Sequence, residues 1–213
     1  MLSGILLAGF SKTLSAQVFQ NGNFASPGGS LGMLEDGTPG MVLNPGSTFV
    51  TGWVTTDNIT AYNGPGRYND APGSSDGYSF ELGAGGHNGG IQQTFSTAPN
   101  TQYKVTFWMT SFWLAWAPPE LTVSAAGQSA NFSAGPSSGN PLNVLWEQKE
   151  FTFNSDGSGL AILKFQNVTT PDFLSAAEID SVQVTQVPEP TTVSLAGFAV
   201  LAMCKRFVKR SKN

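Results

Sequence analysis

The chain has 213 residues, of which only 11% are charged, and it contains 25 Gly and 13 Pro. Its net charge of −4 hides a split, because five of the ten Lys and Arg residues follow Cys204 while all fourteen acidic residues precede it. The acidic body lacks the cationic surface that nucleic-acid binding needs. Because Cys204 is the only cysteine, the body also has no disulfide, thiol nucleophile or thiolate metal site.

Residues 1–16 predict a secretory signal peptide. A short apolar run, Gly4–Phe10, is followed by Leu14-Ser15-Ala16, which offers a small residue before the expected cleavage point. No basic residue precedes the apolar run, which departs from the usual pattern, and an ordinary first strand is the alternative. Cleavage after Ala16 would leave a domain that begins at Gln17.

The body, residues 17–186, predicts an all-β domain. The clearest sign is at 103–110, where Tyr103, Val105, Phe107 and Met109 alternate with polar residues and Trp108. Such alternation is typical of sheets with one buried and one solvated face. About ten strands at this spacing predict a two-sheet antiparallel β-sandwich or jelly roll, with long loops at 25–47 and 63–76. The segments expected to be extended are 18–24, 49–54, 58–62, 78–82, 91–96, 103–110, 121–125, 128–133, 146–153, 160–166 and 178–185.

Several short motifs follow one another along this body. They are Asn21-Gly22-Asn23-Phe24, Gly52-Trp53, Asp76-Gly77-Tyr78-Ser79-Phe80-Glu81-Leu82, Gly89-Gly90-Ile91-Gln92-Gln93-Thr94-Phe95, Tyr103-Lys104-Val105-Thr106-Phe107 and Ile179-Asp180-Ser181-Val182. By these motifs, residues 18–185 resemble the galactose-binding-like jelly rolls of the DUF642 and choice-of-anchor type. The resemblance implies a fold related to that of several carbohydrate-binding modules. The aromatic stretch 111–119 departs from the pattern.

Aromatic side chains in the body predict a glycan-binding surface. Trp108, Trp113 and Trp116, with Tyr62 and Tyr68, are candidates for stacking on the flat C–H faces of sugar rings. Trp108 falls on the solvated face by alternation. The alternative is that Trp113 and Trp116 belong to the core or to a rim packed on the long loops.

Asp180 predicts a metal site. It is in phase with Val182 and Val184 and is therefore expected to point toward the core, where a carboxylate is costly unless it is paired or metal-bound. The resemblance implies a structural Ca²⁺ near this point, with Asp180 as a ligand and carbonyls around Asn21 and Asn23 as co-ligands. The alternative is that Asp180 accepts backbone N–H bonds from a neighbouring loop.

The sequence predicts no catalytic residue. No serine lies in a nucleophile motif with matching His and Asp partners. A pair drawn from Glu147, Glu150, Glu178 and Asp180 could serve glycoside hydrolysis, but acids on an acidic surface explain them better. We therefore expect a protein that is not an enzyme.

Residues 187–213 form a tail with three parts. Pro188-Glu189-Pro190 comes first, an uncharged run from Thr191 to Cys204 follows, and Lys205, Arg206, Lys209 and Arg210 belong to a cationic end. The run predicts a single short transmembrane helix of about 21 Å, which is shorter than the roughly 30 Å core of a bilayer. Because cations stay on the cytoplasmic side, the body is expected outside.

These three parts, in this order, resemble the PEP-CTERM sorting signal. The resemblance implies an exported protein that passes through the inner membrane, is processed by an exosortase-type membrane enzyme, and reaches the cell surface or extracellular matrix. The short apolar run favours removal near Pro190, and an ordinary tail anchor is the alternative. The sequence thus predicts a surface protein that binds polysaccharide without catalysis, or one that is structural and makes no specific glycan contact.

Overall fold

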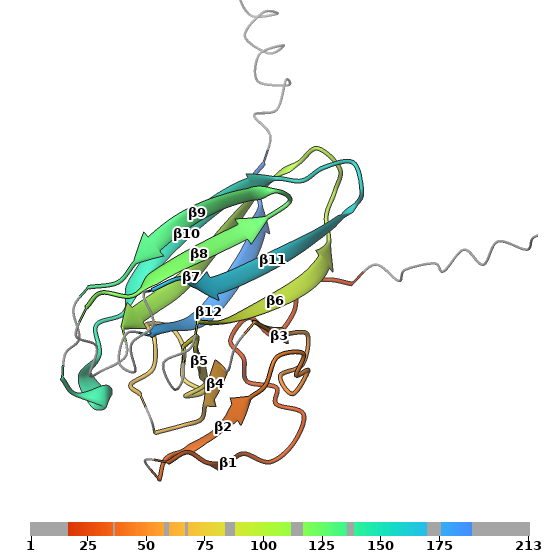
Figure 1. Ribbon diagram of the computed structural model, residues 1–213. Coiled ribbons are helices and arrows are strands. Elements are labelled where there is room, and N and C mark those ends of the chain that lie inside the picture. The colour runs from red at the N-terminus through yellow and green to blue at the C-terminus, as the bar shows by residue number, and fades with distance from the viewer. Residues whose placement is uncertain are drawn as a thin grey trace, which may run out of the picture.

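The computed structural model describes residues 17–35, 37–57, 60–66, 68–83, 88–111, 117–135, 139–169 and 176–188. In this part of the chain, two antiparallel sheets pack against each other (Figure 1). The predicted two-sheet β-sandwich is therefore confirmed. The transmembrane helix predicted after Thr191 lies outside the described residues. Within those residues, no helix has the length and apolar character needed to cross a membrane.

The two sheets contain seven and five strands. In spatial order the larger sheet consists of β1 (Gly32–Met33), β2 (Pro39–Leu43), β4 (Thr60–Asn63), β5 (Ser79–Glu81), β12 (Ala177–Gln186), β7 (Gln102–Ser111) and β10 (Glu147–Asn154). The smaller sheet consists of β3 (Val54–Asp57), β6 (Gly89–Ser96), β11 (Leu160–Asn167), β8 (Glu120–Ala125) and β9 (Gln128–Ser133). A short 3₁₀ helix, Pro141–Asn143, precedes β10.

The core lies between the sheets and follows the predicted alternation. On β7, Val105, Phe107 and Met109 are fully buried, while the intervening Thr106 and Trp108 are only partly buried. The ring of Phe107 meets that of Phe165 on β11 of the other sheet at a centroid distance of 5.1 Å, edge to face. Edge-to-face aromatic contacts add to the stabilisation that burial itself provides.

The N-terminal third differs from the prediction. The expected loop at 25–47 contains β1 and β2, because Gly40 lets β2 pack closely: a Cβ there would lie 2.9 Å from the carbonyl oxygen of Tyr62. The strand expected at 49–54 begins only at Val54, since Gly52 adopts a φ of +85° in a turn just before it. Glycine is the residue that takes this conformation at least cost.

Candidate functional site

A groove lined by both polar and small apolar side chains lies on the outer face of the smaller sheet. Directly opposed residues on antiparallel strands point to the same face. The register pairs Gln92 on β6 with Lys164 on β11, Lys164 with Ser124 on β8, and Ser124 with Ser129 on β9. The residues that alternate with this row, among them Ile91, Phe165 and Val123, are fully buried in the core. The row therefore crosses four strands on the outside of the sandwich.

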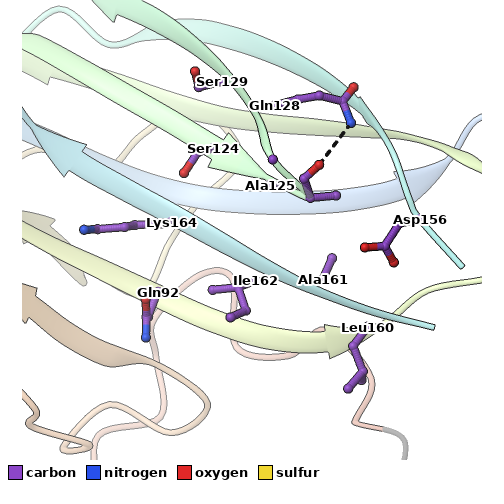
Figure 2. A pocket seen from close by; sticks show the side chains of 12 residues that line it. Gln92, Ser124, Ala125, Gln128, Ser129, Asp156, Leu160, Ala161, Ile162 and Lys164 are labelled. Atoms are coloured by element: carbon purple, nitrogen blue, oxygen red, sulfur yellow. Dashed lines mark hydrogen bonds between the residues drawn. The ribbon is translucent and has the colours of Figure 1, made fainter. Parts of the chain in front are cut away.

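Two turns border the groove at one end. The β8–β9 turn contains Ala126 and Gly127, both at positive φ, as a tight two-residue hairpin requires. The turn before β11 contributes Asp156, and β11 itself contributes its first residue, Leu160. Figure 2 shows Asp156 and Lys164 at opposite ends of the groove. Hydrogen bonds from Ser158 lower the pKa of Asp156.

The groove is suited to neutral, hydroxyl-rich molecules. It has a volume of about 520 Å³ and is lined mainly by amide, hydroxyl and small side chains, with one lysine and one aspartate. Ile162 adds an apolar surface that is 51% exposed. Three gaps of about 4.8 Å between four strands make the row about 14 Å long, which is longer than a single sugar ring. The lining includes no aromatic ring among the described residues, so binding here would rest on hydrogen bonds and aliphatic contact.

Among the described aromatic candidates, Trp108 and Tyr68 both lie near Asp180 on the outer side of the larger sheet, whereas Tyr62 lies in the core. Trp108 is half-buried on the outer face of the larger sheet, opposite Asp180 and Gln148. Tyr68 is 6% exposed and lines a small polar cavity with Asp180 and Trp146. Trp146, which the sequence reasoning did not select, donates its indole N–H to the carbonyl of Asn69. Trp113 and Trp116 lie outside the described residues.

Tyr62 belongs to the core. It has no exposed surface, its hydroxyl donates to the carbonyl of Phe24 at 2.7 Å, and its ring stacks on Tyr78. Burial raises the pKa of this phenol. The prediction that Tyr62 stacks on a sugar is therefore wrong, because its period-2 position faces the other sheet.

Asp180 is buried, but on the opposite face from the one predicted. Ile179 pairs with Met109 on the core side and Asp180 with Trp108 on the outer side, and the register then shifts before Gln183. This β-bulge, with Ser181 at a φ of +52°, adds one residue and returns Val182 to the core. Asp180 is only 2% exposed, because loop residues cover the outer face above it. Its carboxylate accepts hydrogen bonds from the backbone N–H and the hydroxyl of Ser181.

A second carboxylate, Asp76, lies near Asp180. Burial raises the pKa of Asp180 to about 7, and the negative charge of Asp76 contributes in the same direction. Asp76 accepts bonds from the Tyr78 N–H at 3.1 Å and from the Asn23 side-chain amide at 2.7 Å. The sequence reasoning did not select Asp76, although its position two residues before Tyr78 is typical of an Asx turn.

The Asp76–Asp180 region fits a hard cation in its charge and oxygen donors. A polar cavity of about 270 Å³ beside it is lined by Asn23, Ser74, Asp76 and Ser181, among others. Calcium takes six to eight oxygen ligands, many of them carbonyls and waters, so two carboxylates can suffice. Within the described residues there is no group of three or more His, Cys, Asp or Glu suited to a metal. Any cation here would depend on carbonyl, hydroxyl and water oxygens for most of its ligands.

The two asparagines proposed as co-ligands have different roles. Asn21 is a structural turn residue: its side chain donates to the carbonyl of Thr51, and its own carbonyl accepts from the indole of Trp53. Asn23 reaches the site directly through its bond to Asp76, but with its amide nitrogen rather than an oxygen. The backbone between them is fixed to the bulge, since the N–H of Val182 donates to the carbonyl of Gly22 at 2.8 Å.

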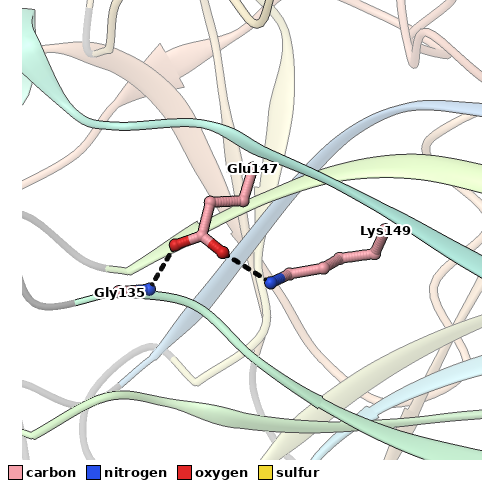
Figure 3. Close-up of polar contacts among 3 residues, drawn as sticks. All are labelled: Gly135, Glu147 and Lys149. Atoms are coloured by element: carbon pink, nitrogen blue, oxygen red, sulfur yellow. Dashed lines mark hydrogen bonds and ion pairs between the residues drawn. The ribbon is translucent and has the colours of Figure 1, made fainter.

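The other acids considered for hydrolysis have structural contacts. Figure 3 shows Glu147 accepting from the backbone N–H of Gly135 at 2.7 Å and contacting the Lys149 ammonium at 2.6 Å. The hydrogen bond from Lys149 lowers the pKa of Glu147. Glu150 pairs with Lys104 at 3.4 Å, and the fully buried Glu178 accepts a bond from the Asn63 amide. These contacts join neighbouring parts of the fold: Glu150 links β10 to β7, and Glu178 links β12 to β4.

Comparison with known proteins identifies the family. Residues 17–185 match the family described as "Protein of unknown function (DUF642)". The chain therefore belongs to the DUF642 family. No curated protein matches it.

Solved structures resemble the fold at low sequence identity. The EclA C-terminal domain, described as a sugar-binding protein, is 13% identical with a TM-score of 0.38 and covers 44% of this chain, which spans 64% of that domain. A stig cyclase from Fischerella sp. TAU is 16% identical over 81% of this chain and 98% of its own, with a TM-score of 0.49. A structure described as "CBM4 structure and function" is 13% identical over 79% of this chain and 99% of its own, with a TM-score of 0.40. These similarities concern the fold alone.

Proposed function

We propose that the chain is an exported surface protein whose sandwich, a galactose-binding-like jelly roll, binds polysaccharide without catalysing a reaction. Its tail, with Pro188-Glu189-Pro190 and the cationic end, would direct it through the inner membrane to an exosortase-type enzyme, which removes the tail near Pro190. The mature domain then acts at the cell surface or in the extracellular matrix.

The groove on the smaller sheet is the observation that carries the binding proposal. Its row of Gln92, Lys164, Ser124 and Ser129 presents one amide, two hydroxyls and one cation across four strands. Sugar hydroxyls donate and accept hydrogen bonds, so a surface of this kind suits them. The acidic character of the body favours a neutral polysaccharide over an anionic one, because like charges repel.

The non-catalytic part of the proposal rests on the roles of the acids. Glycoside hydrolysis needs two carboxyl groups about 5–10 Å apart on either side of a bound sugar. Glu147 and Glu150 are each paired with a lysine, and the groove lining includes a single acid, Asp156, among the described residues. A structural Ca²⁺ near Asp180 and Asp76 would stabilise the loops of the domain rather than act on a substrate.

The test is a glycan array probed with residues 17–188, followed by titration of the best oligosaccharide. The double variant Gln92→Ala/Ser124→Ala removes two hydrogen-bonding side chains, at about 1 kcal/mol each, and should weaken binding about 30-fold. Thr106→Ala, on the outer face of the other sheet, is the matched control and should bind normally.

Two outcomes would change the assignment. Loss of binding in Trp108→Ala with normal binding in the groove variant would move the site to the larger sheet, where the sequence predicted it. An array with no retained glycan would instead favour a structural surface protein that makes no specific sugar contact.

A further inference from the structure

Both ends of the described chain leave the sandwich on the same side. The carbonyl of Gln17 accepts from the N–H of Ser96 at the end of β6, and the N–H of Val187 donates to the carbonyl of Gln102 at the start of β7. Ser96 and Gln102 are joined by the turn at 97–101, which contacts the turn at 154–159. We call the turns 97–101, 125–128 and 154–159 the exit end; it lies towards the upper right of Figure 1.

The last described strand is held at the exit end as far as Val187. β12 stays paired with β7 to Gln186, and Val187 still makes a backbone hydrogen bond, so the domain is ordered to within one residue of Pro188. Four residue steps of at most about 3.6 Å separate Val187 from Thr191, the first residue of the uncharged run, which is a span of about 14 Å. Pro188 and Pro190 fix two of the backbone φ angles and favour an extended, stiff connection.

This short connection limits how far the domain can stand from a bilayer. The headgroup region on each side of the hydrocarbon core is about 5–7 Å thick. If the uncharged run enters the hydrocarbon at Thr191, Val187 lies no more than about 14 Å from that boundary, and within about 9 Å of the headgroup surface. The side of the sandwich from which Val187 emerges must then face the membrane.

The charge distribution at the exit end is compatible with this contact. Of the residues in its three turns, Asp156 is the only charged one. The others are mainly small or neutral polar residues, which can approach headgroups with little electrostatic repulsion. At the far end of the sandwich, by contrast, the exposed Glu120 begins β8 and Asp70 is exposed in a loop.

We infer that the exit end is a membrane-apposed surface: it rests against the lipid headgroups for as long as the tail is inserted. This inference rests on the proposed insertion of the tail and specifies how the domain is oriented by it. The groove borders the exit end, because Ala125, Gln128 and Asp156, from two of the three turns, belong to its lining (Figure 2). The tethered form therefore holds one end of the groove beside the bilayer, and tail removal frees it.

The experiment uses the full chain with Cys204→Ser, so that an introduced cysteine carries the only label. Ala98→Cys at the exit end and Ala117→Cys at the far end form a matched pair, since both are exposed alanines. They are separated by roughly the length of β7, whose ten residues span about 33 Å. Each protein is inserted into phosphatidylcholine vesicles containing headgroup-labelled quencher lipid, and the fluorescence of the label is measured.

The expected result is strong loss of fluorescence at position 98 and none at position 117. A flexible Gly-Ser spacer of about 20 residues, about 25 Å in mean span, inserted between Val187 and Pro188, should relieve the quenching at position 98. Equal quenching at both positions, or quenching at 98 that the spacer does not change, would overturn the inference alone. If the full chain does not co-float with the vesicles in a density gradient, the tail is not inserted, and both the proposed insertion and this orientation are refuted.

Discussion

The buried carboxylate of Asp180 should make the stability of the domain depend on pH. Burial and the nearby Asp76 raise its pKa from the ordinary value of 3.8 to about 7. Between these values the folded protein keeps a proton that the unfolded chain has released. Because the native state binds more protons, the free energy of unfolding must fall as pH rises through this window. Below about pH 4 both states are protonated, and above about pH 7 both are ionised.

The expected size of the effect follows from the same two pKa values. Integrated between pH 5 and pH 8, this single group should lower the free energy of unfolding by about 2.5 kcal/mol. That is a substantial part of the 5–15 kcal/mol by which domains are typically stable. A cation bound between Asp180 and Asp76 would stabilise the ionised form and offset the loss at pH 8.

The assay is urea unfolding of residues 17–188 at pH 5 and pH 8 with a chelator present. Asp180→Asn keeps an oxygen acceptor for the Ser181 N–H but cannot ionise. Between pH 5 and pH 8, the free energy of unfolding of this variant should therefore fall by about 2.5 kcal/mol less than that of the wild type. Asp156→Asn, at an exposed acid, should keep the wild-type dependence. A wild type and Asp180→Asn with the same pH dependence would refute the reasoning. Added Ca²⁺ should raise the wild-type midpoint at pH 8 and leave Asp180→Asn nearly unchanged; no shift in the wild type would remove the calcium hypothesis.

Two further predictions concern how the N-terminal segment is held. Gly22→Ala should destabilise strongly in a thermal melt, because a Cβ there would lie 1.9 Å from the carbonyl oxygen of Val182, whereas Gly157→Ala, with open space around it, should melt normally. Gln93→Ala should cost about 1–3 kcal/mol and speed proteolysis of the first residues, since the buried Gln93 amide pairs with both the N–H and the C=O of Gln20. Proteolysis at the wild-type rate in that variant would argue against this attachment.

Most of the sandwich could be read from the sequence because its central strands are long and regularly alternating. β6, β7 and β11 each alternate between buried residues on one face and more exposed, mainly polar residues on the other, and hydrophobic periodicity reports that arrangement directly. β1 and β2 could not be read in this way. They are short, glycine-containing strands, of which β1 is the edge of the larger sheet and β2 lies next to it. They form because β4 offers a partner for β2, which is a tertiary effect that local patterning does not encode.

The candidate site was harder to predict because it depends on which strands become neighbours. Gln92, Ser124 and Ser129 are ordinary polar residues in the sequence, and only the strand order β6-β11-β8-β9 aligns them in one row. The aromatic residues gave a stronger local signal but a less useful one. Tyr62 was misplaced because an aromatic ring in a strand is as suited to the core as to a sugar, and only burial distinguishes the two.

One extra residue, the bulge at Ser181, changes the face of the sheet to which Asp180 points. Strict alternation from Val184 through Val182 puts Asp180 in the core, where its carboxylate would face only apolar side chains. The bulge at Ser181 moves the Asp180 side chain to the outer face, beneath the loop that carries Asp76. The backbone of Gly22 lies beside the bulge, because its carbonyl accepts a hydrogen bond from the N–H of Val182. A bulge costs ladder pairing and requires a positive φ at a non-glycine residue, so it persists only where other contacts compensate. Here those contacts join the first segment, the 73–78 loop and the last strand, and a cation between the carboxylates would strengthen the same junction. The pH and calcium dependence of unfolding is therefore also a test of why the bulge is there.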